Sequence, residues 1–242
     1  MKQSAMLAAV LGTASIATAF AATQPMKIPL SQLLNGTLEG FINPRDHQLS
    51  GKYPETALDT YVTKKDPAFH WDLATTWTKK GDGWSAVLLN VTSQSWLNSS
   101  AWQYANGAPG GKWWHHVLVV VPDKLLVTDT AFVWIGEDDN APSQHPDSGG
   151  LDLTVATTVA TRIGAVAAAC YFIPNQPVKF FSETPVPQSR QEDAVIAWGW
   201  HEFISKGGSA DWILRLPMTK GVFAAMDAVE AYTASDHYKQ TF

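Results

Sequence analysis

The feature that most constrains the fold is a pair of short, continuously apolar runs in the second half of the chain. Residues Val117–Val121 are all valine or leucine, and Pro122-Asp123 closes the run. Residues Ala165–Ile173 form a second uncharged run, which stops at Pro174. Side chains of a strand point alternately to the two faces of a sheet, so a strand that is apolar at every position is covered on both faces. The two runs therefore predict buried strands of a layered α/β domain.

The neighbouring segments fit the same architecture. Residues Trp84–Thr92 and Leu125–Ile135 are rich in β-branched and aliphatic side chains, which predicts two more strands. Residues Leu151–Arg162 predict a helix between the third strand and the second apolar run. Strands followed by an alternation of helix and strand are typical of a sheet covered by helices. A further strand after Phe242 would continue this order.

Two more helices are predicted near the C-terminus. Ser189-Arg-Gln-Glu192 has the pattern of a capping box, and Gly207-Gly208 would end the helix that follows it. The second helix would begin near Pro217, because proline is tolerated in a first turn. In the first of these helices, the side chains expected on one apolar face are Ile196, Trp200, Phe203 and Ile204.

The N-terminus predicts export. Lys2 precedes an uncharged stretch, Ala5–Phe20, and Ala19-Phe20-Ala21 has the small-x-small pattern that signal peptidase cleaves. We expect residues 1–21 to be a signal peptide cleaved between Ala21 and Ala22, which implies a secreted or periplasmic protein. The alternatives are an apolar N-terminal helix and an uncleaved anchor. Residues 22–57, which are polar and contain Pro and Gly, predict an arm of loops.

Composition excludes several classes of function. The net charge is -5 and no run of Lys or Arg occurs, so we expect no nucleic-acid partner. No later stretch reaches the roughly 18 apolar residues that a membrane helix needs, so no membrane span is predicted after signal cleavage. Cys170 is the single cysteine, and its apolar neighbours predict a buried structural thiol.

Motifs for nucleophilic or metal-assisted chemistry are absent from the sequence. No Gly-x-Ser-x-Gly pentapeptide occurs, and Gly207-Gly-Ser-Ala-Asp211 lacks the second glycine and follows a predicted helix. None of the seven histidines lies at helical metal-ligand spacing, and no second cysteine accompanies Cys170. The rings of His115 and His116 are expected on opposite faces of a strand, where a structural role is favoured. We expect no cofactor and no metal.

Two features leave alternatives open. Asp138, Asp139 and Asp147 lie in the loop after the third strand, where a solvated loop is favoured over an acid–base site. The chain has 11 tryptophans, of which seven lie in its first half. Buried anchors of the core are favoured for these, and an aromatic platform for a peptide or glycan ligand is the alternative.

A series of motifs over Leu58–Phe242 resembles the PhoPQ-activated pathogenicity-related protein family. The most specific are Ser93-Gln-x-Trp-Leu97 and Pro174-Asn-Gln-Pro177. The others, in family order, are Leu58-Asp-x-Tyr-Val62, Asp66-Pro-x-Phe-x-Trp71, Leu89-Asn-Val-Thr92, Trp113-Trp-His-His116, Val121-Pro122, Glu192-Asp-Ala194, Leu216-Pro-Met-Thr-Lys220 and Ala225-Met-Asp227.

The resemblance implies an exported α/β-hydrolase-like fold, similar to serine peptidases of the prolyl-dipeptidyl type. In typical members the run matching Leu216–Phe242 leads to a Gly-x-Ser-Lys-Arg-Gly-Trp elbow. The resemblance therefore predicts an incomplete α/β-hydrolase-type sheet flanked by helices and truncated before the nucleophile elbow. No catalytic triad residue can be assigned. In the loop Gly136-Glu-Asp-Asp-Asn140 the chain keeps one glycine and the asparagine of the family, so Gly136 and Asn140 are candidate oxyanion-loop residues, although Glu137 adds an unfavourable charge.

Three hypotheses about function follow. The first is a hydrolase-like scaffold that is inactive on its own because its nucleophile lies outside this sequence. The second is a non-catalytic secreted protein for binding or signalling that uses Trp-rich loops to recognise a peptide or glycan. The third is a gene fragment without function, since a sheet that stops early leaves an unpaired edge.

Overall fold

The computed structural model describes residues 5–9, 55–136, 138–140 and 150–241. Contacts divide the chain into two units, one of residues 1–10 and 65–242 and the other of residues 11–64. The described helix of the second unit is α3 (Ala57–Thr63), which begins with a capping box in which Thr56 and Asp59 bond each other's backbone N–H.

The elements of the first unit alternate as the sequence predicts, with additional strands. The strands are β1 (Ala5–Ala9), β2 (His70–Gly81), β3 (Trp84–Ser95), β4 (Trp102–Tyr104), β5 (Lys112–Pro122), β6 (Val127–Ile135), β7 (Ala165–Cys170) and β8 (Val178–Phe180). The helices are α4 (Leu151–Ile163), α5 (Glu192–Lys206), the 3-10 turn η2 (Ala210–Trp212), α6 (Arg215–Thr233) and α7 (Asp236–Thr241).

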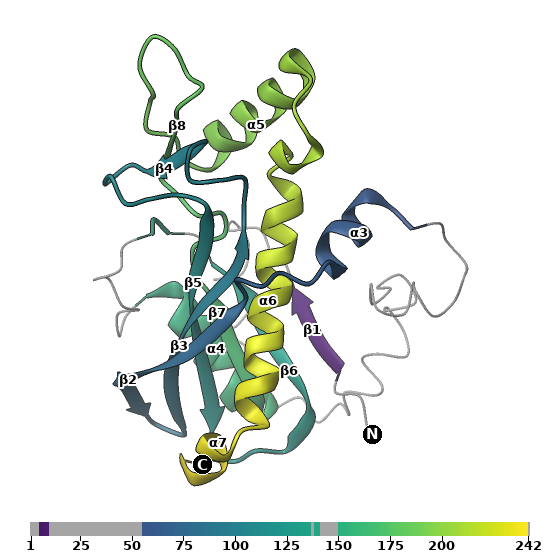
Figure 1. Ribbon diagram of the computed structural model, residues 1–242. Helices are drawn as coiled ribbons and strands as arrows, with labels where there is room; N and C mark the ends of the chain where they lie inside the picture. Colours follow the sequence, from purple (N-terminus) through teal and green to yellow (C-terminus); the bar gives the residue numbers. More distant parts are fainter. Residues whose placement is uncertain (1–4, 10–54, 137, 141–149, 242) are drawn as a thin grey trace, which may run out of the picture. The chain divides into compact units, whose positions relative to one another are not determined.

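A six-stranded, mostly antiparallel sheet forms the centre, in the order β1-β6-β7-β5-β3-β2 (Figure 1). Strands β2, β3, β5 and β7 pair antiparallel, whereas β6 pairs parallel with both β7 and β1. The parallel pair β6–β7 is joined through α4, as parallel neighbours require a crossover. The short strands β4 and β8 make a separate antiparallel pair.

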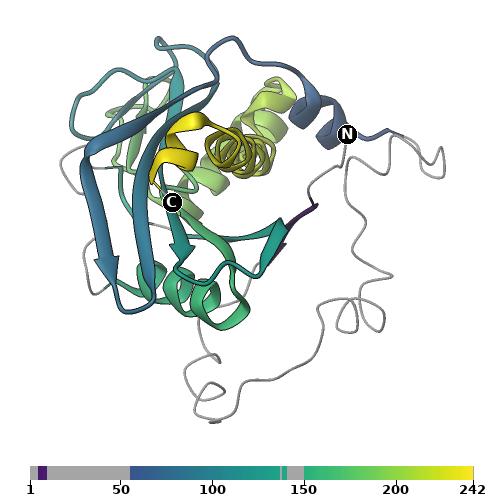
Figure 2. The ribbon, with the colours of Figure 1, turned by 90° about the horizontal axis from the view of Figure 1, so that it is seen from below.

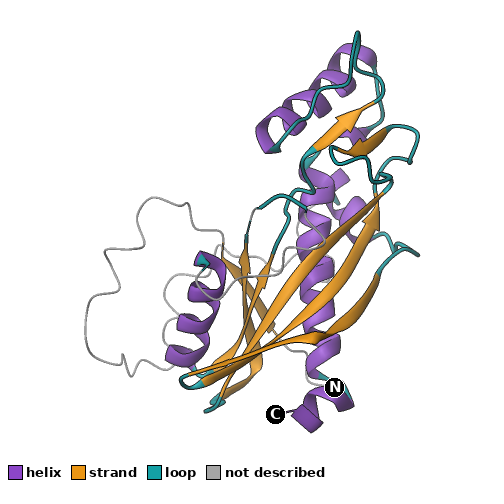
Figure 3. Ribbon diagram, turned by 90° about the vertical axis from the view of Figure 1, so that its left-hand side faces the viewer, coloured by secondary structure: helices purple, strands orange, loops and turns teal. Residues whose placement is uncertain are grey.

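Helices α4 and α6 lie on opposite faces of this sheet (Figures 2 and 3). In β5, Val117, Val119 and Val121 belong to the core under α6, with Ala225 and Val229 of that helix. The intervening side chains, Leu118 and Val120, belong to the core under α4, with Leu153 and Ala156. The continuous apolar run is thus a strand covered on both faces, and the predicted α/β layering is confirmed.

A third core, rich in aromatic side chains, lies among β4, β8, α5 and η2. It contains the fully buried side chains Trp96, Trp102, Trp113 and Phe180, with partly buried Trp198 and Trp212 packed against them. Rings of Trp96 and Trp102, and of Trp96 and Trp113, have centroids 5.4 Å apart. This core holds the α5 region beyond one end of the sheet (Figure 1).

The predicted start of α5 was wrong, and its predicted packed face was wrong at Trp200 and Ile204, whereas Ile196 does pack against the third core. The helix begins at Glu192 with Gln191 as N-cap, without a side-chain cap, so Ser189 forms no capping box. Trp200 is 41% exposed and Ile204 70%, while the buried residues are Val195, Gly199 and Glu202. The reason is Gly199: a Cβ there would lie 2.3 Å from the Trp212 carbonyl oxygen, so the helix approaches η2 closely at this glycine and leaves Trp200 and Ile204 exposed.

The second apolar run ends as a strand earlier than predicted. Strand β7 stops at Cys170, and Phe172 has a left-handed φ of 68°. The remaining residues of the run, Tyr171–Ile173, are buried but lie in the loop that leads to Pro174. Apolar composition therefore predicted burial correctly beyond the point where the strand ends.

Candidate functional site

The carboxyl ends of β6 and β7 meet at one edge of the sheet, where ligands of parallel α/β sheets commonly bind. The loop after β6 begins at Gly136 and the loop after β7 at Tyr171. Each contains a residue other than glycine with a left-handed φ, Asp138 (73°) and Phe172 (68°). Such strained conformations cluster at functional sites. Polar contacts hold these two loops together.

Asn140 joins the two loops directly. Its backbone N–H donates to the Gln176 carbonyl at 2.6 Å, and its side-chain oxygen accepts from the Gln176 N–H at 2.8 Å. Its amide nitrogen donates to the Trp114 carbonyl of β5 at 3.2 Å. The loop after β6 is thereby fixed to both the loop after β7 and the central strand.

Asn175 is fully buried and uses both ends of its side-chain amide. The oxygen accepts from the Tyr104 hydroxyl at 2.6 Å and from the Trp114 N–H at 2.9 Å. The nitrogen donates to the carbonyls of Trp114 and Phe172 at 3.0 and 2.9 Å. Burial raises the pKa of Tyr104 well above its ordinary value, so this hydroxyl stays protonated and donates.

Gln176 connects the same loops to helix α5. Its side-chain oxygen accepts from the Glu192 N–H at 2.6 Å, which satisfies one of the free amides of the first turn. Nearby, the Gln191 side chain donates to both oxygens of Asp139 at 3.0 and 3.1 Å. We call Asn140, Asn175 and Gln176 the amide cluster. It fixes β5, β4, α5 and the loops after β6 and β7 at one edge of the sheet.

The two predicted oxyanion-loop residues lie at this edge, and their own backbone amides are already bonded. The Gly136 N–H donates to the Cys170 carbonyl at 2.8 Å, and that of Asn140 to Gln176. A Cβ on Gly136 would lie 2.9 Å from a carboxylate oxygen of Asp152, which accepts from the Trp134 ring N–H. In this structure the glycine therefore serves close packing against α4, and the oxyanion role of the loop stays a prediction.

A serine–histidine pair that the sequence did not single out lies beneath α6. The Nδ1 atom of His115 is 3.1 Å from the Tyr171 carbonyl, which can only accept, so Nδ1 bears the proton and Nε2 accepts from the Ser93 hydroxyl at 2.8 Å. Burial lowers the pKa of His115 to about 4, which keeps the ring neutral near pH 7. The bonding resembles an activated serine.

Access distinguishes this pair from a catalytic one. The Ser93 side chain is 1% exposed and His115 is fully buried. The position of a Cβ on Gly221 of α6 lies 3.2 Å from Nε2, so the helix backbone covers the ring. Beside it, the Gln94 side chain donates to the Pro217 carbonyl at 2.7 Å. The pair joins β3, β5 and α6, and its role is structural, as expected for His115.

The remaining sequence-predicted residues do not add a reactive group. His116 lies on the opposite face from His115, its ring 5.2 Å from that of Phe172. Cys170 is buried and unpaired, and burial raises its pKa. No three metal-ligating side chains come together within the described residues. Ala21, Ala22 and Asp147 lie outside the described residues.

The tryptophans of the first half are mainly core residues. Trp96, Trp102 and Trp113 are fully buried, and Trp77 nearly so, which leaves no free face for a ligand. Trp71, Trp84 and Trp114 are half-buried and pack against the cores of the sheet. The one large exposed tryptophan face in the described part of the chain is that of Trp200 on α5.

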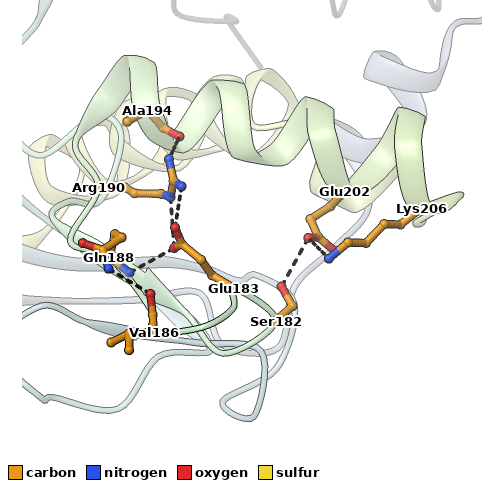
Figure 4. Close-up of polar contacts among 8 residues, drawn as sticks. All are labelled: Ser182, Glu183, Val186, Gln188, Arg190, Ala194, Glu202 and Lys206. Carbon is orange, nitrogen blue, oxygen red and sulfur yellow. Dashed lines mark hydrogen bonds and ion pairs between the residues drawn. The ribbon is translucent and has the colours of Figure 1, made fainter.

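A partly buried ion pair closes the loop before α5, as Figure 4 shows. Arg190 donates to Glu183 through Nε (3.2 Å) and Nη2 (2.6 Å), and the Gln188 N–H donates to the same carboxylate at 3.0 Å. The guanidinium also lies 4.7 Å from the centre of the Trp198 ring. Arg190 lowers the pKa of Glu183, so the pair is charged at neutral pH and holds the loop against α5.

Together these features define a mixed α/β protein whose amide cluster orders the loops at the carboxyl ends of its parallel strands. The chain belongs to the PhoPQ-activated pathogenicity-related protein family, whose model matches residues 58–241. Autocrine proliferation repressor protein A of Dictyostelium discoideum is 32% identical over 178 residues, which cover 73% of this chain and 33% of that protein. The chain thus spans about a third of the length of this relative. No solved structure matches the chain.

Two of the three residues of the amide cluster lie in motifs that the sequence shares with the family. Asn175 and Gln176 belong to Pro174-Asn-Gln-Pro177, and Trp114 to Trp113-Trp-His-His116. In the described structure these side chains form hydrogen bonds with buried backbone groups. A sequence motif alone does not show which backbone groups these are. Within the described residues no helix is long and apolar enough to cross a membrane.

Proposed function

We propose that the chain is an exported, α/β-hydrolase-like scaffold that frames an active-site edge without supplying the attacking group. The observation that supports this proposal most is that the loops after β6 and β7 are held in place at one edge of the sheet. The amide cluster fixes both loops that follow the parallel strands, and it does so through Asn140 and Asn175, buried side chains that cannot move without leaving polar groups unpaired. Such rigidity suits a site that positions a substrate.

The course of the chain supports the hydrolase-like part of this proposal. The crossover β6–α4–β7 covers one face of the sheet, and α6 covers the other (Figure 3). Helix α6 starts at the edge where Gln94 bonds Pro217 and leads away from α5 toward the opposite end of the sheet (Figure 1). A following strand parallel to β6 would return to the amide-cluster edge, where a nucleophile elbow belongs in such folds.

We assign the role of nucleophile to no residue of this sequence. The sequence lacks Gly-x-Ser-x-Gly, and Ser93, which has a histidine partner, is sealed beneath α6. Export is supported by the uncharged segment Ala5–Phe20 and the small residues that follow it. We therefore expect the purified chain to hydrolyse neither esters nor peptides.

A secreted binding or signalling protein is the second candidate. It is favoured by the relative, which is named as an autocrine proliferation repressor. The exposed apolar side chains Trp200 and Ile204 on α5 offer a surface for a peptide or glycan. Replacing both by serine should abolish such binding while leaving the fold intact, because neither side chain belongs to a buried core.

Two measurements test the proposal. N-terminal sequencing of the exported product should give Ala22 as first residue, and a product that stays inside the cell with Met1 retained would contradict export. Assays of the full chain with p-nitrophenyl esters and with dipeptide amides should show no turnover above buffer. Turnover that is lost on replacing one of the chain's own serines would contradict the scaffold role.

A further inference from the structure

Three segments of the sequence have the pattern Asn-x-Ser/Thr of an acceptor for an N-linked oligosaccharide. They are Asn35-Gly-Thr37, Asn90-Val-Thr92 and Asn98-Ser-Ser100. The pattern is short and common, so the surroundings of each asparagine in the fold decide which of them a transferase can use. Asn35 lies outside the described residues, and the other two lie in a central strand and in the loop that follows it.

Asn90 lies within β3, which is bonded to a neighbouring strand on each side. Its register partners are Asp72 of β2 and His116 of β5. The side chain of Asn90 is exposed, but its backbone cannot leave the sheet without breaking these pairings. A transferase binds all three residues of an acceptor segment, so the folded sheet withholds this one.

The loop between β3 and β4 presents Asn98 differently. Leu97 packs against the third core and has a left-handed φ of 51°, and the three residues after it, Asn98–Ser100, are exposed. Gly111, with a φ of 93°, allows their backbone to approach closely, since a Cβ there would lie 3.1 Å from the Ser99 nitrogen. The acceptor segment therefore lies at the surface, outside the paired strands.

Hydrogen bonds within the segment hold its two reactive side chains together. The Asn98 side-chain oxygen accepts from the Ser100 N–H at 3.0 Å and from the Ser100 hydroxyl at 2.5 Å. The Asn98 carbonyl accepts from the Ala101 N–H at 3.0 Å. Among the described residues the amide nitrogen of Asn98, Nδ2, has no hydrogen-bond partner. A hydroxyl bonded to the amide oxygen makes this nitrogen easier to deprotonate, and the nitrogen itself is open to a donor.

We propose that Asn98 is an acceptor for an N-linked oligosaccharide, and that the folded protein offers this asparagine and withholds Asn90. The proposal rests on the proposed function, because export brings the chain to the transferase. The donor is an oligosaccharide linked to a polyprenyl diphosphate. The Asn98 Nδ2 atom attacks C1 of its first sugar, and the N–C1 bond forms as the C1–O bond to the diphosphate breaks. The lipid diphosphate leaves with the electron pair, and Nδ2 loses one proton to a base of the transferase.

Secretion from cultured animal cells tests the site. The chain is produced once with its own residues 1–21 and once with an unrelated cleavable signal in their place, which separates the site from the export proposal. Enzymatic removal of glycans in water labelled with heavy oxygen converts each occupied asparagine to a labelled aspartate, which peptide mass spectrometry locates. Asn98 should be occupied in most secreted chains. An unoccupied Asn98 in the chain with the unrelated signal overturns the proposal, whereas failure of secretion with its own signal alone contradicts only export.

Variants show whether the hydroxyl of the segment is needed. Ser100→Ala should abolish the glycan at Asn98, and Ser100→Thr should keep it. The matched control is Asn106→Gln, which replaces an exposed asparagine whose side-chain oxygen accepts from the Ala108 N–H at 2.9 Å but which has no hydroxyl two residues later. It should leave the occupancy of Asn98 unchanged. A glycan that persists in Ser100→Ala overturns the assigned acceptor segment.

Modification of the folded chain tests the selectivity between the two asparagines. The full chain, purified from bacteria without glycans, is incubated with a purified transferase and the lipid-linked donor. Asn98 should be modified at least about tenfold faster than Asn90, because access to Asn90 requires local unfolding of β3. Peptides of residues 86–95 and 94–104 should both be modified, which would assign the difference to the fold. Equal rates at Asn90 and Asn98 in the folded chain overturn the selectivity.

Discussion

At the scale of single residues, the amide cluster and the Ser93–His115 pair show the same physics. In both, buried polar groups are bonded by residues from distant parts of the chain, as Asn175 bonds Tyr104 and Trp114. Leaving such a group unpaired costs more than forming the bond gains, so these side chains determine which backbone arrangement is stable. The sequence could predict that His115 is buried, since it lies in a strand of apolar residues, but not that Tyr171 would orient its ring.

The first prediction concerns Asn175. Replacement by alanine removes the side-chain acceptor of the Trp114 N–H and the side-chain donor to the Phe172 carbonyl, whereas the Tyr104 hydroxyl keeps the Lys112 carbonyl. Because these groups are buried, we expect a loss of about 3 kcal/mol or more in the free energy of unfolding. Urea denaturation measures it. The control is Asn106→Ala, which removes a solvent-exposed bond to the Ala108 N–H and should cost less than about 1 kcal/mol. Equal losses in the two variants would contradict the importance of the amide cluster.

The second prediction concerns the pH dependence of stability through His115. Its pKa is about 4 in the folded state and about 6.5 in the unfolded state, so the unfolded chain binds more protons between these values. This group's contribution should be constant above pH 6.5 and fall by about 3 kcal/mol as the pH drops to 4.

The matched variants separate His115 from the other titrating groups. In His115→Gln the fall between pH 6.5 and 4 should shrink, whereas His70→Gln, which replaces an exposed histidine, should keep it. Glu183 overlaps only the lower end of this window, because a carboxyl whose folded-state pKa is lowered loses its contribution as the pH falls from its ordinary value of 4.5 toward the folded value. A pH profile of His115→Gln that matches the wild type would contradict the buried neutral ring.

At the scale of elements, α5 shows that the periodicity of apolar residues does not always predict which face of a helix is buried. Trp200 and Ile204 have the spacing of a buried face, yet the packed face is built around Gly199 because the η2 backbone approaches it. Close approach of one backbone to another leaves no apolar signature in the sequence. Strands covered on both faces are predicted more reliably, since every position must then be apolar, as in β5 and β7.

The third prediction tests this packing. Gly199→Ala should destabilise the protein by about 1–3 kcal/mol, because the new Cβ would meet the Trp212 carbonyl at 2.3 Å. Intrinsic helix propensity alone would predict that the same substitution raises the free energy of unfolding by up to about 1 kcal/mol. Ala197→Gly, on the exposed side of the same helix, should lose only that propensity. Thermal denaturation compares them, and a Gly199→Ala variant at least as stable as wild type would contradict the close contact.

At the scale of the whole molecule, the buried strands and the two covering helices are the parts that sequence patterns predicted, and the strand order and the site are the parts they did not. Gly136 and Asn140 were chosen from a family motif, and both lie at the amide-cluster edge, but their N–H groups bond Cys170 and Gln176. Hydrogen-bond partners depend on the tertiary arrangement, which short motifs do not specify. The proposal of a hydrolase-like scaffold therefore rests on the loops that the amide cluster holds after β6 and β7.

The most direct test of that proposal is labelling of the full chain with a fluorophosphonate that reacts with activated serines. We expect no covalent adduct by intact mass, because Ser93 is sealed beneath α6 and the sequence has no nucleophile elbow. Ser93→Ala should give the same result. Stoichiometric labelling of one serine, lost when that serine is replaced, would contradict the claim that this chain frames a site without supplying its attacking group.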